Sequence, residues 1–533
     1  MSEKPRFLLL LLLGLGWLAS TAPGLSGVKG REEKPVEGGT LRIKPFSGAL
    51  NVNLDPARES ETFLMEQMFD GLVRLDKDLN VTPALAEYWT ISPDGRTYTF
   101  FLRRGVKFHN GRELASEDIK FSLERLLDPK LASPYADLFL ERVAGAAEFR
   151  SGSASEVSGF RSPDRRTFEI RWNRPYVSGL YLLSMPYCKA LPRDLVRSQG
   201  SDFFWKPVGT GPFRFAHWLR SPRLEVVGLR LERNPGYFAS RPHLSAIEYS
   251  PFYTLEHFRD KEADIIPFVS EGLSGTDCSI RDEGSLEVVL LGMSCHLAPL
   301  DKPAVRRALA MAVDRGRIAR VSTTSESLPQ LLQSFVPPRL PGFFPADEDW
   351  RTDIAEARIL MEREGFSGRK PFPPLALFVR ADRREAAYRL YRELRDQLRD
   401  LGIRLSLRTY RRDGELQAVR NPYLVLIEKR LEFPDADGLL RPLFHSRSAQ
   451  NLTRYASPRF DKILDEADVE RSWSGRLEML RKAERLLAAD LPGLPLFSPA
   501  KRMAIQPHVR GVEVPALGFS YLNTLKIWVR KRG

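Results

Sequence analysis

The segment from Gln67 to Pro129 carries the densest run of ordered secondary-structure signals in the chain, and it constrains the fold more than any other stretch. Residues Pro93–Gly95 are typical of a turn, and the alternating apolar and polar side chains of Tyr98–Leu102 predict a half-buried strand. A helix is predicted after this strand, capped by Ser116 and ended by Pro129. The apolar residues on one face of that helix are Ile119, Leu123, Leu126 and Leu127.

Later segments carry signals of the same kind. Apolar and polar residues alternate along Phe168–Trp172, so we expect this ribbon to share a sheet with the first. Pro207–Trp218 contains glycines but lacks the strand-to-helix context of a phosphate loop, and its Pro212 predicts a turn that enters a strand. A further helix is predicted with Asp301 as its cap and Pro303 in its first turn.

Taken in this order, the segments resemble the extracellular solute-binding proteins, family 5, which are the dipeptide, oligopeptide and nickel receptors of ABC importers. The first segment matches over about sixty positions, which is far longer than a short motif. The similarity continues to the C-terminal part and covers nearly everything after the N-terminal segment. It implies an α/β, periplasmic binding protein-like fold (type II, cluster C), with two lobes closing on a hinge and an extra inserted domain.

The resemblance also implies an order of domains. We expect a signal peptide at 1–26, the first part of domain I at 36–66, an inserted domain II at 67–195, the second part of domain I at 196–290, domain III at 291–510 and a C-terminal return to domain I at 511–533. Helix and strand patterns alternate within domain III, which by itself predicts a mixed α/β layer. A chain of 533 residues is too long for one core, so several packed units agree with its length.

The N-terminus predicts export to the periplasm. Lys4 and Arg6 precede an apolar run at 7–18 and small residues at 19–22, which is typical of a signal peptide. Because Pro23 disfavours cleavage after Ala22, an uncleaved N-terminal anchor stays open as the alternative. The chain's three cysteines are too few for a disulfide framework, although Cys278 and Cys295 can either pair or remain separate thiols.

Composition and motifs exclude several classes of function. Lys and Arg number 81 against 68 Asp and Glu, a net charge of +13, but most bases are interspersed with acids, and the denser clusters lack the aromatics of nucleic-acid modules. We therefore expect no nucleic-acid partner. The chain has no GxSxG, HExxH, CxxC or Walker A motif, and its seven histidines are scattered. No catalytic residue, metal site or cofactor is predicted.

The resemblance assigns a ligand site between the two lobes, where an extended peptide needs partners for both charged ends. The family's acid for the ligand ammonium falls on Glu432, with Phe433 as the following aromatic and Asp435 as the second acid. The Gly-Trp pair that precedes this acid in the family is missing here. A salt bridge within the loop is therefore an equal alternative for Glu432.

Arg380 follows a strand of domain III at about the place where a dipeptide-binding relative carries an arginine for the ligand carboxylate. Arginine suits bidentate pairing with a carboxylate, although a basic loop that faces water is the alternative. Three weaker candidates, on the loop after the first strand of domain I, are Phe46, Ser47 and Gly48. At one position the family commonly carries an Asn, and this chain has Ser294 or Cys295 there. The ligand contacts that the family makes at that position are therefore not carried over to this chain.

The sequence thus predicts a non-catalytic, monomeric periplasmic receptor that captures peptides or peptide-like solutes and delivers them to the ABC permease subunits of the inner membrane. A receptor for a nickel complex, haem or an oligosaccharide, and an N-terminally anchored sensor with the same fold, stay open as alternatives. A cytoplasmic regulator is disfavoured by the export signal.

Overall fold

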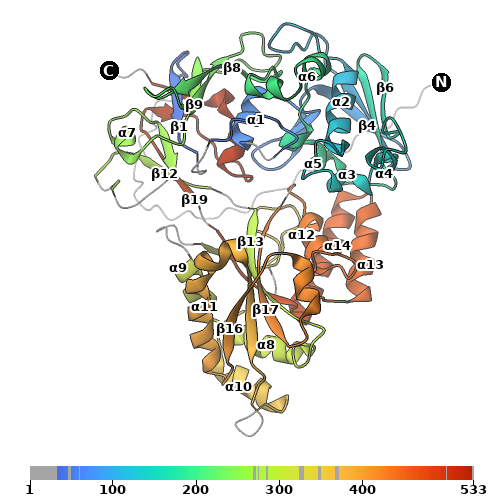
Figure 1. The fold of residues 1–533 in the computed structure, drawn as a ribbon, viewed down its shortest axis with the longest axis vertical. Helices are drawn as coiled ribbons and strands as arrows, with labels where there is room; N and C mark the ends of the chain where they lie inside the picture. Colours follow the sequence, from blue (N-terminus) through green and yellow to red (C-terminus); the bar gives the residue numbers. More distant parts are fainter. Residues whose placement is uncertain are drawn as a thin grey trace, which may run out of the picture. The chain divides into compact units, whose positions relative to one another are not determined.

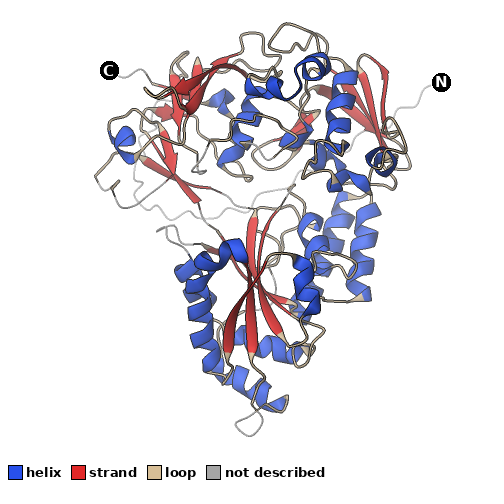
Figure 2. Ribbon diagram, in the orientation of Figure 1, coloured by secondary structure: helices blue, strands red, loops and turns tan. Residues whose placement is uncertain are grey.

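A computed structural model of the chain describes residues 33–45, 50–58, 61–267, 272–273, 275–283, 286–322, 329–345, 350–366, 371–431, 433–499 and 501–530. The chain divides into two compact units, Met1–Pro35 and Val36–Gly533, and every element below lies in the second. Helices and strands alternate along that unit, and its described residues form three sheets of four or more strands (Figures 1 and 2). The expected α/β class is confirmed.

The part of the chain that contains Gln67–Pro129, the segment richest in secondary-structure signals, folds around a four-stranded sheet in the order β4-β5-β7-β6. Its strands are β4 (Ala86–Ile91), β5 (Thr97–Leu102), β6 (Phe160–Asp164) and β7 (Thr167–Arg171). β5 pairs antiparallel with β7, so the two predicted ribbons share one sheet. Its helices are α2 (Ser116–Leu127), α3 (Asp137–Leu140), α4 (Ala146–Arg150) and α5 (Gly179–Leu183), and the pair β2 (Val73–Leu75) and β3 (Val81–Pro83) precedes the sheet.

Helix α2 is capped differently from the prediction. Its N-cap is Ala115, whose backbone N–H donates to Asp118 Oδ2 at 3.0 Å. Ser116 lies in the first turn, where its hydroxyl donates to the backbone carbonyl of Asp164 on β6. The prediction of Ser116 as the cap is wrong because this hydroxyl ties the helix to the sheet instead. Asp301 is not a cap either, since the later helix α8 (Pro303–Met311) is preceded directly by Lys302.

The second sheet has seven strands in the order β12-β19-β11-β1-β10-β9-β8. They are β1 (Thr40–Ile43), β8 (Phe213–Arg220), β9 (Val226–Arg233), β10 (Ala246–Tyr249), β11 (Ile265–Pro267), β12 (Ser279–Glu283) and β19 (Lys501–Ile505). β1 runs parallel to both of its neighbours, and Leu41 and Ile43 are buried. Around it lie α1 (Thr62–Met68), α6 (Arg193–Gln199), α7 (Leu255–Arg259) and the pair β20 (Val509–Arg510) and β21 (Trp528–Val529).

The third sheet has six strands in the order β14-β18-β13-β17-β15-β16. They are β13 (Glu287–Met293), β14 (Gln330–Leu331), β15 (Leu375–Arg380), β16 (Leu405–Tyr410), β17 (Tyr423–Arg430) and β18 (Gly493–Ser498). One face packs against α8, α9 (Arg315–Ser322), α10 (Ile354–Arg363) and α11 (Arg384–Arg399), and the other against α12 (Asp437–Phe444), α13 (Pro458–Val469) and α14 (Trp473–Asp490). Successive β17 residues therefore enter opposite cores, Leu424 on one side and Val425 on the other.

The chain passes twice between the seven-stranded and the six-stranded sheet. β12 and β19 pair with each other in the seven-stranded sheet, whereas β13 and β18, their neighbours along the chain, pair in the six-stranded sheet. The two crossings fall between Glu283 and Glu287 and between Ser498 and Lys501. The two crossings lie side by side, because the strands that flank them pair in both sheets. The domain boundaries drawn from the sequence stay predictions.

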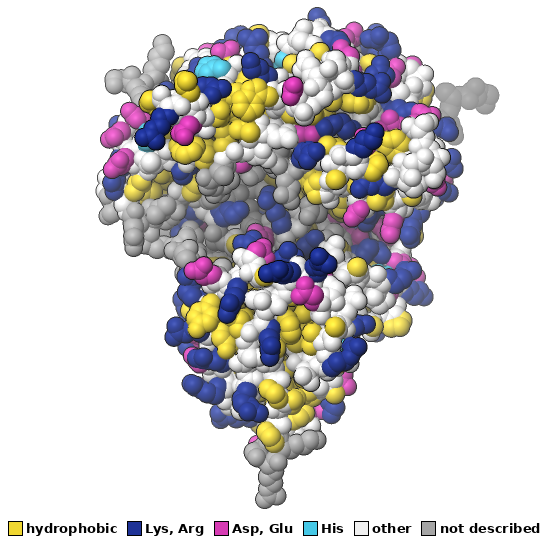
Figure 3. Space-filling view, in the orientation of Figure 1, with side chains coloured by type: hydrophobic (Ala, Val, Ile, Leu, Met, Phe, Trp, Pro, Cys, Tyr) yellow, Lys and Arg dark blue, Asp and Glu magenta, His cyan; other side chains and the backbone are white. Residues whose placement is uncertain are grey.

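Three further expectations concern cysteines, membrane segments and charge. Cys188, Cys278 and Cys295 are all free thiols. In the described part of the chain, no helix combines the length and apolar character needed to cross a membrane, and the predicted signal peptide lies outside that part. On the face drawn in Figure 3, Lys and Arg side chains are spread over the surface and intermixed with acids, so the positive charge is not gathered in one patch there.

Candidate functional site

The predicted ligand residue Arg380 lies at one edge of the six-stranded sheet, where the carboxyl ends of three strands meet. Arg380 ends β15, and the parallel register places it beside Tyr410, which ends β16. β17 also runs parallel to β15, so its last residues reach the same edge, where Arg430 is paired with Glu287 at the start of β13. This sheet edge therefore lies next to the point where the chain changes sheet (Figure 1).

A cavity of about 190 Å³ opens at the sheet edge. Its lining is rich in charged and hydroxyl groups, and the polar residues that contribute are Arg380, Arg383, Tyr410, Asp413, Glu428, Lys429 and Gln450. The sequence predicts alternating helices and strands in this part of the chain, with one strand directly before Arg380. The parallel order of the strands was not predicted, and it is this order that brings Tyr410, Asp413 and Glu428 to Arg380.

The arginines at the sheet edge are only loosely paired. Arg380 Nε lies 3.4 Å from Asp382 Oδ1, and its Nη1 lies 4.0 Å from Asp413 Oδ1. Arg383 Nε lies 3.4 Å from Glu428 Oε2. The Arg380 and Arg383 side chains are 51% and 56% exposed, and each guanidinium carries five N–H donors. Donors thus remain for a ligand, and a carboxylate is the acceptor that matches their planar geometry.

Burial sets the protonation of the other groups at the sheet edge. It raises the pKa of Glu428, and the positive charge of Arg383 opposes this rise. It also raises the pKa of Tyr410 to about 12, so the phenol stays a hydrogen-bond donor at neutral pH. The site therefore offers fixed positive charge, a neutral hydroxyl and a carboxyl group whose pKa is raised by burial.

The other predicted ligand residues cannot be placed at this edge. Glu432, Phe46, Ser47 and Gly48 lie outside the described residues. Phe433 is 4% exposed and packs in an apolar cluster whose other buried members all lie between 57 and 190. The Phe433 ring therefore packs the part of the chain that forms the six-stranded sheet against the part that forms the four-stranded sheet. The assignment of all five residues to a ligand site stays a prediction.

Asp435, the second acid of the same loop, belongs to a buried junction between α5 and α14. Its carboxylate accepts hydrogen bonds from Arg476 Nη2 at 2.9 Å, from the Ser178 hydroxyl at 2.8 Å and from the Asp437 N–H at 2.8 Å. Arg476 and Asp435 are both 1% exposed, and Tyr181 packs on Trp473 beside them, with ring centroids 5.7 Å apart. The Asp435 carboxylate is thus held by three donors of the protein and offers little to a ligand, although Arg476 Nη1 has no hydrogen-bond partner among the described residues.

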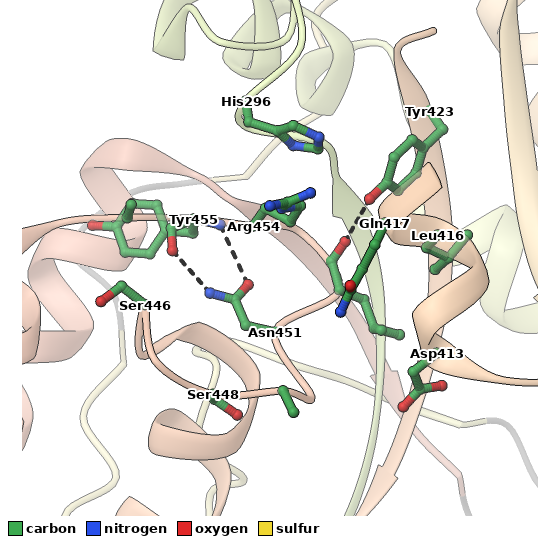
Figure 4. A pocket seen from close by; sticks show the side chains of 13 residues that line it. His296, Asp413, Leu416, Gln417, Tyr423, Ser446, Ser448, Asn451, Arg454 and Tyr455 are labelled. Atoms are coloured by element: carbon green, nitrogen blue, oxygen red, sulfur yellow. Dashed lines mark hydrogen bonds between the residues drawn. The ribbon is translucent and has the colours of Figure 1, made fainter. Parts of the chain in front are cut away.

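A second cavity, of about 370 Å³, lies along the flank of the six-stranded sheet (Figure 4). Several of its polar side chains are already hydrogen-bonded to the protein. Tyr423 Oη donates to the Leu452 carbonyl at 2.8 Å, and Asn451 Nδ2 donates to the Tyr455 carbonyl at 2.8 Å. Ser294, which departs from the family's Asn, accepts the Tyr423 N–H at 2.9 Å and so supports strand pairing rather than a pocket.

Metal binding has no candidate among the described residues, since nowhere in those ranges are three or more His, Cys, Asp or Glu side chains grouped to hold an ion.

Comparisons with known proteins agree on one family. A model described as "Bacterial extracellular solute-binding proteins, family 5 Middle" matches residues 80–451. Di/tripeptide-binding protein 2 of Pseudomonas aeruginosa (strain UCBPP-PA14) is 24% identical over 89% of this chain and 92% of its own length. The probable deoxycholate-binding periplasmic protein YgiS of Escherichia coli (strain K12) is 26% identical over 86% of this chain and 88% of its own. The unliganded open form of the murein tripeptide-binding protein MppA superposes with a TM-score of 0.79 at 20% identity, covering 93% of this chain and 98% of that one.

Proposed function

The chain belongs to the bacterial extracellular solute-binding proteins, family 5, and from that premise we propose that it captures a peptide or peptide-like solute at the sheet edge. The observation that carries the proposal is the pair of exposed, loosely paired arginines, Arg380 and Arg383, at the mouth of a cavity. Their planar guanidinium groups suit the carboxylate of a ligand.

Peptide chemistry follows from what surrounds these arginines. A peptide carries a carboxylate, an ammonium and backbone amides, and the sheet edge offers arginines for the first and Glu428 for a positive charge. Glu432 and Phe433 remain our proposal for further contacts with the amino end, and Phe46, Ser47 and Gly48 for contacts from the other lobe. Relatives named for di/tripeptides and for oligopeptides support this class of solute.

The transport cycle is proposed on the same basis. The two crossings between sheets would act as the hinge on which the lobes close, and the loaded protein would deliver its solute to the permease subunits of an ABC importer. We further propose export through the segment 1–26, a monomeric state, and no catalysis. The domains named from the sequence would provide the two lobes.

The identity of the solute is tested first by native mass spectrometry of the purified protein, and then by calorimetric titration with short peptides. A peptide that binds only the folded protein also raises the melting temperature with concentration. Each binding peptide is compared with its C-terminally amidated form. If Arg380 holds the carboxylate, amidation weakens binding by about tenfold or more, because a charge-assisted hydrogen bond contributes about 1.5–3 kcal/mol.

The residue is tested by Arg380→Ala, with Arg399→Ala as the matched control. Arg399 is also an exposed arginine, 75% exposed and 3.9 Å from its acid, but it lies on α11 away from the cavity. We expect Arg380→Ala to weaken the free peptide about tenfold and the amidated peptide hardly at all. Equal affinities for Arg380→Ala and the unaltered protein would remove Arg380 from the site. Tighter binding of deoxycholate than of any peptide would redirect the proposal to a steroid carboxylate, the ligand in the name of one relative.

A further inference from the structure

A third and larger cavity, of about 720 Å³, lies between the segment of the four-stranded sheet and the helices α12 and α13. One side is lined by residues on and just after α3 and by the loop after β7, and the other by α12, the loop that follows it and α13. Among the described lining residues it shares only Gln450 with the cavity at the sheet edge. Its size is in the range of pockets that hold small molecules.

Two deeply buried side chains on its wall carry a polar atom that makes no hydrogen bond within the described residues. Tyr176 is 4% exposed and His445 is 3% exposed. Within the part of the chain that the structure describes, neither Tyr176 Oη nor His445 Nε2 makes a hydrogen bond. Native proteins rarely leave buried polar atoms unsatisfied, because each unpaired group loses its bonds to water without replacement. Tyr176 Oη is therefore available to something that enters the cavity, whereas His445 Nε2 already lies 3.4 Å from Asp465 Oδ1.

One arginine of the cavity also lacks an acidic partner. Arg142 Nη1 donates to the Leu138 carbonyl at 3.2 Å, and its guanidinium lies 5.2 Å from the centre of the Tyr176 ring. No carboxylate of a described residue lies within 4.0 Å of it. Arg441, by contrast, is fully engaged, 3.1 Å from Asp437 and 2.8 Å from Asp465. Arg142 and Tyr176 together thus present donors for a carboxylate on one wall.

The opposite wall carries a carboxylate that is short of donors. The nearest cation to Asp468 among the described residues is Arg441, 3.9 Å away, and Arg441 makes closer contacts elsewhere. Burial and the neighbouring Asp437 raise the pKa of Asp468 to about 6, which is the behaviour of a carboxyl group without a sufficient cation. A ligand ammonium would supply the missing charge.

Arg142 and Asp468 belong to opposite walls, and they interact without touching. The negative charge of Asp468 raises the pKa of Arg142, and the positive charge of Arg142 lowers that of Asp468. The two groups are nevertheless not within the 4.0 Å of an ion pair. A molecule with a carboxylate and an ammonium can fill such a gap, with its carboxylate toward the arginine and its ammonium toward the aspartate. A ligand with one charge would leave one wall unpaired.

We propose that this cavity is a second binding site, separate from the sheet edge, and that it takes a free α-amino acid. The carboxylate accepts from Arg142 and the Tyr176 hydroxyl, and the ammonium donates to Asp468. The cavity leaves room for the amino-acid side chain.

The test is a thermal-shift screen of the full chain with each standard L-amino acid singly, followed by calorimetric titration. The amino acid with the largest shift is compared with its amide and with its decarboxylated amine, each of which lacks the carboxylate charge, and with its N-acetyl form, which lacks the ammonium. We expect saturable binding of the amino acid and affinities at least tenfold weaker for all three analogues. Absence of binding by every amino acid, or equal binding of the analogues, overturns the proposal.

Two isosteric variants identify the site. Tyr176→Phe removes only the unpartnered hydroxyl, so it should fold at least as well as the original chain while weakening the amino acid about tenfold. Asp468→Asn removes the negative charge and should weaken it by a similar factor. Tyr88→Phe, at a residue 52% exposed on β4, is the matched control and should change nothing. Unchanged affinity in Tyr176→Phe, or loss of amino-acid binding in Arg380→Ala, which alters only the sheet edge, would show that the amino acid does not bind in this cavity.

Discussion

At the junction between α5 and α14, Arg476 and Asp435 are each only 1% exposed, whereas at the sheet edge the Arg380 and Arg383 side chains are 51% and 56% exposed. The junction carboxylate accepts three hydrogen bonds of 2.8–2.9 Å. The acids at the sheet edge make single contacts of 3.4–4.0 Å to their arginines. Arginine and carboxylate side chains are thus buried and tightly hydrogen-bonded at the junction, but exposed and loosely paired at the sheet edge.

The difference separates a structural role from a binding role. A buried charge must be paired, because leaving it unpaired in the interior is costly, so the partners at the junction are committed to each other. Exposed pairs contribute little to stability, since water and salt screen them. Arginines at the sheet edge can therefore exchange their acids for a ligand at small cost to the fold, while those at the junction cannot.

The largest effect is expected from Asp435→Ala at the junction. The substitution leaves the Arg476 charge buried without an acid and removes the acceptor for Ser178 and for the Asp437 N–H. We expect the free energy of unfolding, measured by urea denaturation, to fall by about 3–5 kcal/mol. Asp382→Ala, which removes the 66% exposed partner of Arg380, is the control and should change it by less than about 0.5 kcal/mol. Comparable losses in both variants would erase the distinction between the regions.

Glu484 is another buried acid, and its protonation makes the free energy of unfolding depend on pH. Glu484 on α14 accepts hydrogen bonds from the Ser334 hydroxyl and from the Val336 N–H at 3.0 Å through Oε1. Among the described residues its Oε2 has no partner. Burial raises the pKa of Glu484 from 4.5 to about 7. Between these values the unfolded chain has released its proton and the folded protein keeps it, so stability is greatest at the acid end and falls as pH rises.

Glu484→Gln should flatten this dependence because the amide does not titrate. Urea denaturation at about pH 5 and about pH 8 is expected to show a loss for the unaltered protein that is larger by about 3 kcal/mol than for the variant. Glu478→Gln is the matched control, since Glu478 lies on the same helix but is 44% exposed. A pH profile of Glu484→Gln that coincides with that of the control variant would mean that Glu484 titrates normally.

The sequence predicted local structure better than it predicted sites. Alternation along Thr97–Leu102 and Thr167–Arg171 was enough to place both strands in one sheet, because side-chain period depends only on local geometry. Ser116 was a plausible cap by residue type, but its hydroxyl bonds to Asp164, a contact 48 residues away that no local pattern contains. Helix boundaries were therefore nearly right while the capping residue was wrong.

The sites likewise depend on contacts between residues that are far apart in the sequence. Arg380 was named from the sequence, yet its neighbours Tyr410 and Glu428 join it only because β15, β16 and β17 run parallel and end at one edge. The loop acid Asp435 was read with the ligand residues, but Arg476 and Ser178, distant by 41 and 257 residues, enclose it. Residue type suggested charge recognition in both places. Burial decided which of the two charges is free to bind.

The smallest effect is expected from Arg383→Ala at the sheet edge. Its contact with Glu428 is single, 3.4 Å long and 56% exposed on the arginine side, so the free energy of unfolding should fall by no more than about 1 kcal/mol. The pKa of Glu428 should rise further above its ordinary value, because burial already raises it and Arg383 is the strongest group that lowers it. Carboxyl-selective NMR titration measures that rise, with Arg399→Ala as the control that leaves it unchanged. Removal of a partner from the junction is expected to cost several times more. A loss in Arg383→Ala as large as that in Asp435→Ala would therefore mean that the Arg383–Glu428 pair also supports the fold. The arginines at the sheet edge would then not be free to exchange their acids for a ligand.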